Sequence, residues 1–183
     1  MRACPGIPVL ALVLIAGCAA PIVPQRTKPG GAARWALATA TPVALEWAPD
    51  AVPCRIFGAG VGSDGWLPDQ GGNWQVTFWS ASKPPVLEVT VDSEGKVASQ
   101  PAAQSPHRGH TLPADWADSP KTWAATRRHQ ASEPLQTFEA ALAFDAEPER
   151  YPGQCVWRLR FFREDGGFET HALTPQGMWL ASY

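Results

Sequence analysis

The stretch WQVTFWSASKPPVLEVTVDSEGKV, residues 74–97, recurs in outline as WRLRFFREDGGFETHALTPQGMW, residues 157–179. Each stretch begins with alternating apolar residues, the period of two that is typical of a half-buried strand. A turn and a second strand follow, and each stretch closes on a tight turn with a glycine, where a positive φ costs little. The shared pattern predicts two antiparallel hairpins of the same design.

The apolar positions of the two stretches correspond in pairs. Trp74 matches Trp157 at the start of each stretch. After one deletion between the strands, Val91 falls on Leu173. The remaining pairs are Val76 with Leu159, Phe78 with Phe161, and Gly95 with Gly177. This correspondence indicates an internal repeat.

A helix is predicted directly before the second hairpin. Residues 118–130 read DSPKTWAATRRHQ, which opens with Asp118 and Ser119 as capping residues. Pro120 then occupies the first helical position, where its missing N–H has no cost. Helix-forming residues follow.

The same arrangement is predicted before the first hairpin. Residues 33–47 indicate a helix that contains Pro42. This proline either kinks the helix or starts a shorter one capped by Thr41. Between helix and hairpin, each copy carries one more apolar segment, residues 53–61 and 135–144, which predicts a strand.

The predicted unit is thus helix, strand, strand, strand, occurring twice. The segments WAPDAV, WQVTF and VDSEGKV, followed by DSP at a helix start and a second W-x-L-x-F hairpin, resemble PepSY-like, cystatin-type α+β repeats over residues 34–183. The resemblance implies an α+β fold. In it, two helix-plus-three-strand antiparallel repeats would pack as one unit.

The first residues have the layout of a secretory signal, with Arg2 followed by a short apolar run. The run ends LIAGC, residues 14–18, which resembles the lipobox of bacterial lipoproteins. The resemblance implies cleavage between Gly17 and Cys18, a diacylglycerol on the Cys18 sulfur and a fatty-acylated amino group such as a palmitoyl amide. The alternative is an ordinary signal peptide cut nearby, with Cys18 an incidental thiol.

An acylated Cys18 would place the protein in a bacterial cell envelope, anchored to a membrane by lipid. Ala19 follows in place of aspartate, so in a host with two membranes the lipoprotein rule indicates the outer membrane, facing the periplasm. The predicted organisation of the chain is a signal peptide at 1–17, a lipidated cysteine with a proline-rich tether at 18–33, a first repeat at 34–97, a connecting loop at 98–117 and a second repeat at 118–183.

Two cysteines remain in the exported part, Cys54 and Cys155. In an oxidising envelope an isolated pair is most simply a disulfide, and such a bridge would join the two repeats. The alternative is two buried thiols that act as small apolar side chains.

The charge pattern excludes one class of partner. The chain has 15 Lys and Arg against 17 Asp and Glu, a net charge of −2, with no basic stripe, so nucleic acid is not expected to bind. Most of the 9 tryptophans are expected in the core or on half-buried strands. Trp66 and Trp116 are candidates for exposed aromatic anchors at an interface.

The connecting loop contains HRGH, in which His107 and His110 could share a metal ion with Asp115 as an oxygen ligand. The alternative is a solvated loop. His129 is expected in the last turn of the second helix, and His171 on a strand, facing solvent or a neighbour.

The sequence offers no candidate catalytic residues, because it contains neither G-x-S-x-G nor H-E-x-x-H and pairs no nucleophile with a base. No cofactor is expected. These features favour an anchored, non-catalytic binding module that contacts a protein partner, and the family resemblance suggests restraint of a peptidase. The alternatives are a carrier of a small ligand or metal that uses the groove between the repeats with His107 and His110, and a structural lipoprotein without a specific ligand.

Overall fold

The computed structural model describes residues 31–103, 105–129, 137–144, 146–163 and 165–183. Within these ranges the chain forms two helices and eight strands. In chain order they are α1 (Ala33–Trp47), β1 (Val52–Gly62), β2 (Asn73–Trp79), β3 (Val86–Asp92), β4 (Val97–Ala102), α2 (Ser119–Thr126), β5 (Thr137–Phe144), β6 (Cys155–Phe162), β7 (Phe168–Leu173) and β8 (Trp179–Ser182).

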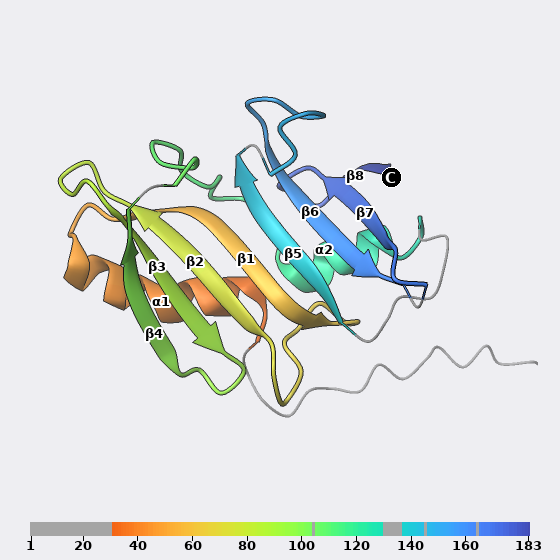
Figure 1. The fold of residues 1–183 in the computed structure, drawn as a ribbon, viewed down its shortest axis with the longest axis horizontal. Coiled ribbons are helices and arrows are strands. Elements are labelled where there is room, and N and C mark those ends of the chain that lie inside the picture. Colours follow the sequence, from red (N-terminus) through yellow and green to blue (C-terminus); the bar gives the residue numbers. More distant parts are fainter. Residues whose placement is uncertain (1–30, 104, 130–136, 145, 164) are drawn as a thin grey trace, which may run out of the picture.

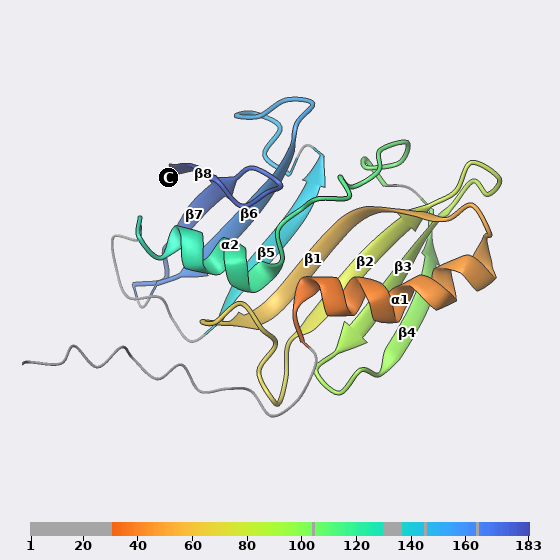
Figure 2. The ribbon, with the colours of Figure 1, turned by 180° about the vertical axis from the view of Figure 1, so that it is seen from behind.

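All eight strands belong to one antiparallel sheet with the order β4-β3-β2-β1-β5-β6-β7-β8 (Figure 1). The central pair is β1 and β5, which joins the strands that follow α1 to those that follow α2. Both helices lie on the same face of the sheet, α1 over the first half and α2 over the second (Figure 2). We call the opposite face the open face.

The predicted fold of two helix-plus-three-strand repeats is wrong. Each helix is followed by four strands, and the eight strands form a single sheet. The prediction missed β4, which begins at Val97 and extends into the expected loop at 98–117, and β8, which has 4 residues. Strand β4 reads VASQPA, with no apolar alternation and a proline, a composition that an edge strand tolerates because it needs only one ladder of hydrogen bonds.

Both predicted hairpins are present, as β2–β3 and β6–β7. Trp74 pairs with Val91 in the first hairpin, and Trp157 pairs with Leu173 in the second. The residues that correspond between the two stretches of sequence therefore occupy corresponding positions in the two ladders.

The helix α1 runs without interruption through Pro42. Thr41 does not cap a shorter helix, because its hydroxyl donates to the carbonyl of Leu37 at 2.7 Å. Pro42 and Ala38 are both exposed, so the carbonyl that the proline leaves unpaired faces water. Small residues face the sheet at helical spacing: Ala33, Ala36, Ala40 and Ala44.

The core lies between the helices and the sheet. Its largest fully buried side chains include Trp74, Phe78, Phe138 and Trp157. Because side chains alternate along a strand, these inward positions leave their neighbours to project from the open face. Among the described residues, no helix combines the length and apolar character that a bilayer crossing requires.

Candidate functional site

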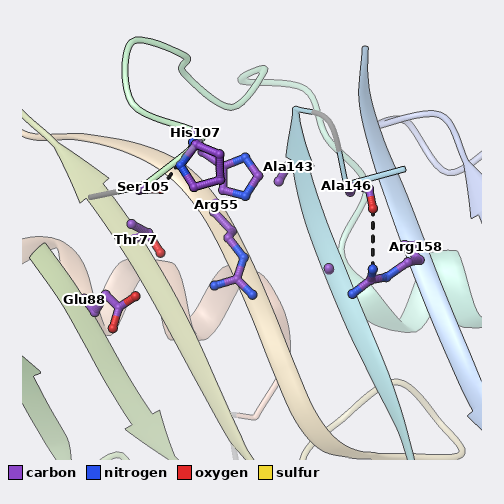
Figure 3. Close-up of a pocket in the computed structure, with 10 residues that line it drawn as sticks. Arg55, Thr77, Glu88, Ser105, His107, Ala143, Ala146 and Arg158 are labelled. Carbon is purple, nitrogen blue, oxygen red and sulfur yellow. Dashed lines mark hydrogen bonds between the residues drawn. The ribbon is translucent and has the colours of Figure 1, made fainter. Parts of the chain in front are cut away.

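A pocket of about 380 Å³ lies on the open face, across the central strands β1 and β5 (Figure 3). Ten residues line it: Arg55, Thr77, Glu88, Ser105, Pro106, His107, Ala141, Ala143, Ala146 and Arg158. They come from β1, β2, β3, β5 and β6 and from two loops. The pocket thus forms where the two halves of the sheet meet.

The floor of the pocket is β5, where two alanines stand between two arginines. Ala143 pairs with Arg55 of β1, and Ala141 pairs with Arg158 of β6. The arginines therefore rise from opposite sides of the same strand, offset by two residues along it. Both alanines are nearly buried but line the pocket, and their short side chains leave it room between the two arginines.

The guanidinium of Arg55 is held in place from two sides. Its Nη1 donates to Oε1 of Gln75 at 3.1 Å, and its Cζ lies 4.9 Å from the centre of the Phe57 ring. Burial lowers the pKa of Arg55, the negative charge of Glu88 opposes this shift, and the positive charge of Arg158 adds to it. The two arginines are thus close enough to repel each other.

Arg158 is anchored from the loop after β5. Its Nη1 donates to the carbonyl of Ala146 at 3.4 Å and lies 3.6 Å from Oε1 of Glu147 (Figure 3 shows the contact with Ala146). Its side chain is 22% exposed. A guanidinium has five N–H donors, and both of these contacts use the same nitrogen, so others are available to a ligand.

Two polar residues close the side of the pocket toward β3. Thr77 is 1% exposed, and its hydroxyl has no hydrogen-bond partner among the described residues. Glu88 accepts hydrogen bonds from Nε2 of Gln75 at 3.2 Å and from Nε2 of Gln100 at 3.4 Å. Gln75 therefore links Arg55 to Glu88.

The two histidines of HRGH are directed to different neighbours. His107 lines the pocket, next to Ser105, whose Oγ accepts from the His107 backbone N–H at 3.2 Å. His110 stacks on Phe144 with ring centres 4.5 Å apart. Asp115 accepts from Gln176 at 3.1 Å. In the described part of the chain, no three His, Cys, Asp or Glu residues gather as metal ligands would.

The predicted Cys54–Cys155 bridge is not formed, and both thiols are free and buried. Cys54 lies on β1 and Cys155 on β6, with β5 between them. Two strand spacings separate their backbones by about 10 Å, beyond the ~7 Å that a disulfide can span. Burial raises the pKa of each thiol to about 12. The structure therefore has the alternative arrangement, in which both cysteines are buried free thiols.

Of the two aromatic anchor candidates, Trp116 is part of the core. It is 3% exposed, packs edge-on against Trp157 at 5.8 Å, and is covered by the Arg34 guanidinium at 4.4 Å. Trp66 is half-buried in the connection between β1 and β2. Within the described ranges, the large apolar side chains that are exposed are instead Leu45, Phe162, Phe168, Met178, Trp179 and Leu180.

The remaining histidines lie in the second half of the fold. His171 is on a strand, β7, and faces neighbours rather than solvent: it is 0% exposed, its Nε2 lies 2.8 Å from Oε1 of Glu169, and its ring packs edge-on against Phe161. His129 follows the end of α2 and stacks on Trp179 at 4.0 Å. Gly17 and Cys18 lie outside the described residues.

The sequence analysis missed the residues that line the pocket, apart from His107. Arg55 and Arg158 sit at the polar positions of alternating strands, a pattern that usually means only a solvated face. The signal that could have found them is an arginine at an outward position of a strand beside the outward alanines Ala141 and Ala143 of β5, but it requires knowing that β5 lies between β1 and β6.

Comparisons of the chain with protein-family models, with curated proteins and with solved structures find no match.

Proposed function

We propose that this chain is a lipid-anchored, non-catalytic binding protein of a bacterial cell envelope, and that it holds a small ligand in the pocket between β1 and β5. The observation that supports the ligand is the pocket itself, about 380 Å³ in volume. Sites for small molecules are typically clefts of about 300–1,000 Å³ with a few polar groups at fixed positions. Here those groups are the two arginines, Thr77 and Glu88.

The position of the pocket adds a second reason. It is built from strands of both halves of the single sheet, and His107, which the sequence offered as a ligand residue, lines it. His110 and a metal ion are no part of this proposal, because the two histidine rings lie in different surroundings.

The anchor rests on the sequence LIAGC. A lipid on Cys18 and a proline-rich tether that ends before the folded residues 31–33 would hold the sheet clear of the membrane surface. In a host with two membranes, Ala19 favours the outer membrane, with the folded part in the periplasm.

The anchor is tested by mass spectrometry of the mature amino terminus and by cell fractionation. We expect an acylated cysteine at position 18 and recovery with the membranes, both abolished by Cys18→Ser. Cys4→Ser is the matched control, because Cys4 lies in the segment that would be removed. An unmodified amino terminus in the wild-type protein contradicts the anchor.

The ligand pocket is tested on the detergent-solubilised chain by NMR, with a mixture of small carboxylic acids, amides and alcohols as probes. We expect shifts in residues 105–107 and 141–143. Ala143→Leu, which fills the pocket, should abolish them, and Ala98→Leu, the same change on exposed β4, should not. Shifts that are absent, or that survive Ala143→Leu, contradict the proposal.

A second candidate function is contact with a partner protein, including restraint of a peptidase. Met178, Trp179 and Leu180 are 64%, 37% and 36% exposed; Met178 directly precedes the edge strand β8, and the other two begin it. A photocrosslinker at position 178 should capture a discrete partner in cells. The matched control is position 45 on α1, where Leu45 is 46% exposed. Equal background from both positions contradicts this candidate.

A further inference from the structure

We infer that the pocket recognises a small oxyanion, a carboxylate or a phosphate, held between Arg55 of β1 and Arg158 of β6. This inference rests on the proposed function, since it names the chemistry of the ligand that the pocket would hold. Four observations support it, and each concerns a different part of the site.

The first observation is geometric. Arg55 and Arg158 pair with Ala143 and Ala141 on the two sides of β5, so the two side chains border one open space (Figure 3). Guanidinium groups bind carboxylate and phosphate oxygens through parallel N–H donors. An anionic group above the alanines can accept from both arginines at once.

The second observation is the charge balance. Among the described residues, the ion pairs within 4.0 Å involve Arg158, Arg160, Arg163 and His171 but not Arg55. Arg158 is paired with the carboxylate of Glu147, which lies 3.6 Å from its Nη1. Burial lowers the pKa of Arg55, the charge of Glu88 opposes this shift, and the charge of Arg158 adds to it. A bound anion would act in the same direction as Glu88 and favour the charged guanidinium.

The third observation is the hydroxyl of Thr77. The residue lines the pocket, and its hydroxyl is buried and has no hydrogen-bond partner among the described residues. A buried polar group without a partner costs free energy, roughly 1–3 kcal/mol, and structures usually satisfy it. A rotation of the Thr77 side chain would turn this hydroxyl toward the pocket, where a ligand oxygen would accept its hydrogen.

The fourth observation limits the ligand. Glu88 closes the side of the pocket toward β3 and accepts hydrogen bonds from Gln75 and Gln100. A second negative charge on that side would be repelled. The rest of the lining is Ser105, His107, Pro106 and three alanines, and the short alanine side chains leave room for a small body. The ligand is therefore expected to carry one anionic group.

The test uses the detergent-solubilised full chain and isothermal titration calorimetry with three probes. Butyrate and inorganic phosphate carry the two candidate anionic groups, and butyramide is a neutral match for butyrate in size. We expect butyrate or phosphate to bind at least about tenfold more tightly than butyramide, a factor that corresponds to one charge-assisted hydrogen bond. Which of the two anions binds identifies the class.

Variants place the binding in the pocket. Arg55→Gln and Arg158→Gln should each weaken binding about tenfold. Arg163→Gln is the control, because Arg163 lies in the turn after β6 with its side chain 49% exposed, away from the pocket. Thr77→Val leaves both charges in place and should weaken binding severalfold without loss of stability, so it gives an answer even if an arginine variant does not fold.

The outcomes separate the inference from the proposed function. The inferred preference for an anion is contradicted if butyramide binds as tightly as butyrate, or if the Arg55→Gln and Arg158→Gln variants bind as tightly as Arg163→Gln. If the pocket still binds neutral probes, the proposed function of holding a small ligand stands. Absence of binding by both anions also overturns the inference. If no small probe at all shifts residues 105–107 and 141–143, the proposed function fails with it.

Discussion

The backbone N–H of Arg34 donates a 3.0 Å hydrogen bond to Oδ1 of Asp118, a residue 84 positions further along the chain. The same oxygen accepts from the N–H of Ser119 at 2.8 Å, and Oγ of Ser119 accepts from the N–H of Ala33 at 3.0 Å. The cap position of α1 is Ala32, which has no side-chain acceptor of its own. The start of α2 therefore caps both helices.

We expect Asp118→Ala to lower the free energy of unfolding by about 2 kcal/mol, because two helix starts lose an acceptor and a nearby negative charge. Urea denaturation measures this value. Asp115→Ala is the matched control, since its carboxylate is exposed and accepts only from Gln176 among the described contacts. Equal losses in the two variants, or two separate transitions in the wild type, contradict the shared cap.

A second relationship occurs once within each half. The indole N–H of Trp157 donates to the carbonyl of Ala117 at 3.1 Å, and that of Trp74 donates to the carbonyl of Gly31 at 2.9 Å. Each acceptor lies two residues before the first residue of a helix. The two corresponding tryptophans thus fix the approach of each helix to its hairpin.

The two acceptor carbonyls differ in whether they keep another hydrogen-bond donor when the tryptophan is changed. The carbonyl of Gly31 also accepts from the backbone N–H of Leu67 at 2.8 Å, so it keeps a partner when Trp74 is changed. The carbonyl of Ala117 has Trp157 as its donor. We expect Trp157→Phe to cost about 1 kcal/mol more than Trp74→Phe in urea denaturation, because the penalty for an unsatisfied buried carbonyl is added. Equal costs, or a larger cost at Trp74, contradict this reading.

The parts of the fold that the sequence predicted are those whose signal is local. The hairpins follow from alternation within 74–97 and 157–179, and the start of α2 follows from the cap at Asp118 and the proline after it. Strand β4 has no such signal, because its sequence VASQPA lacks apolar alternation and it forms only by pairing with β3. The single sheet depends on the pairing of β1 with β5, which no local pattern encodes.

The same reason explains why the pocket was missed. Arg55 and Arg158 become neighbours only because β5 lies between their strands and carries alanines at the two paired positions. In the sequence each arginine is one polar residue on an alternating strand. The cysteines were predicted to be neighbours but are not. Strand β5 lies between the strands that carry them, which prevents the disulfide that the composition favoured.

Cys54 and Cys155 are expected to resist alkylation in the folded protein. Burial raises the pKa of each thiol to about 12, so the reactive thiolate is scarce at neutral pH, and neither sulfur is open to reagent. Treatment with iodoacetamide near pH 8, followed by intact-mass measurement, should show neither thiol modified before denaturation and both modified after it. The control is the same experiment after reduction, which should change nothing. Adducts on these two residues that require a reductant contradict the free thiols.

His171 makes stability depend on pH in the mildly acidic range. It is fully buried on β7, where burial lowers its pKa from 6.5 and the charge of His129 acts in the same direction, while the carboxylate of Glu169 at 2.8 Å opposes them. With a lower pKa in the folded state, the unfolded chain binds more protons below about pH 6.5, so stability falls as the pH falls through that range.

Urea denaturation at a series of pH values between about 7 and 5 measures this dependence. His171→Gln removes the titrating group and should flatten the decline relative to the wild type. His110→Gln is the matched control, because the His110 ring stacks on Phe144 outside this cluster, and it should leave the slope as it is. Wild type and His171→Gln curves that run parallel over the whole range would show that His171 does not carry the dependence. A wild-type stability that rises as the pH falls would mean that Glu169 outweighs burial, so that the pKa of His171 is raised instead.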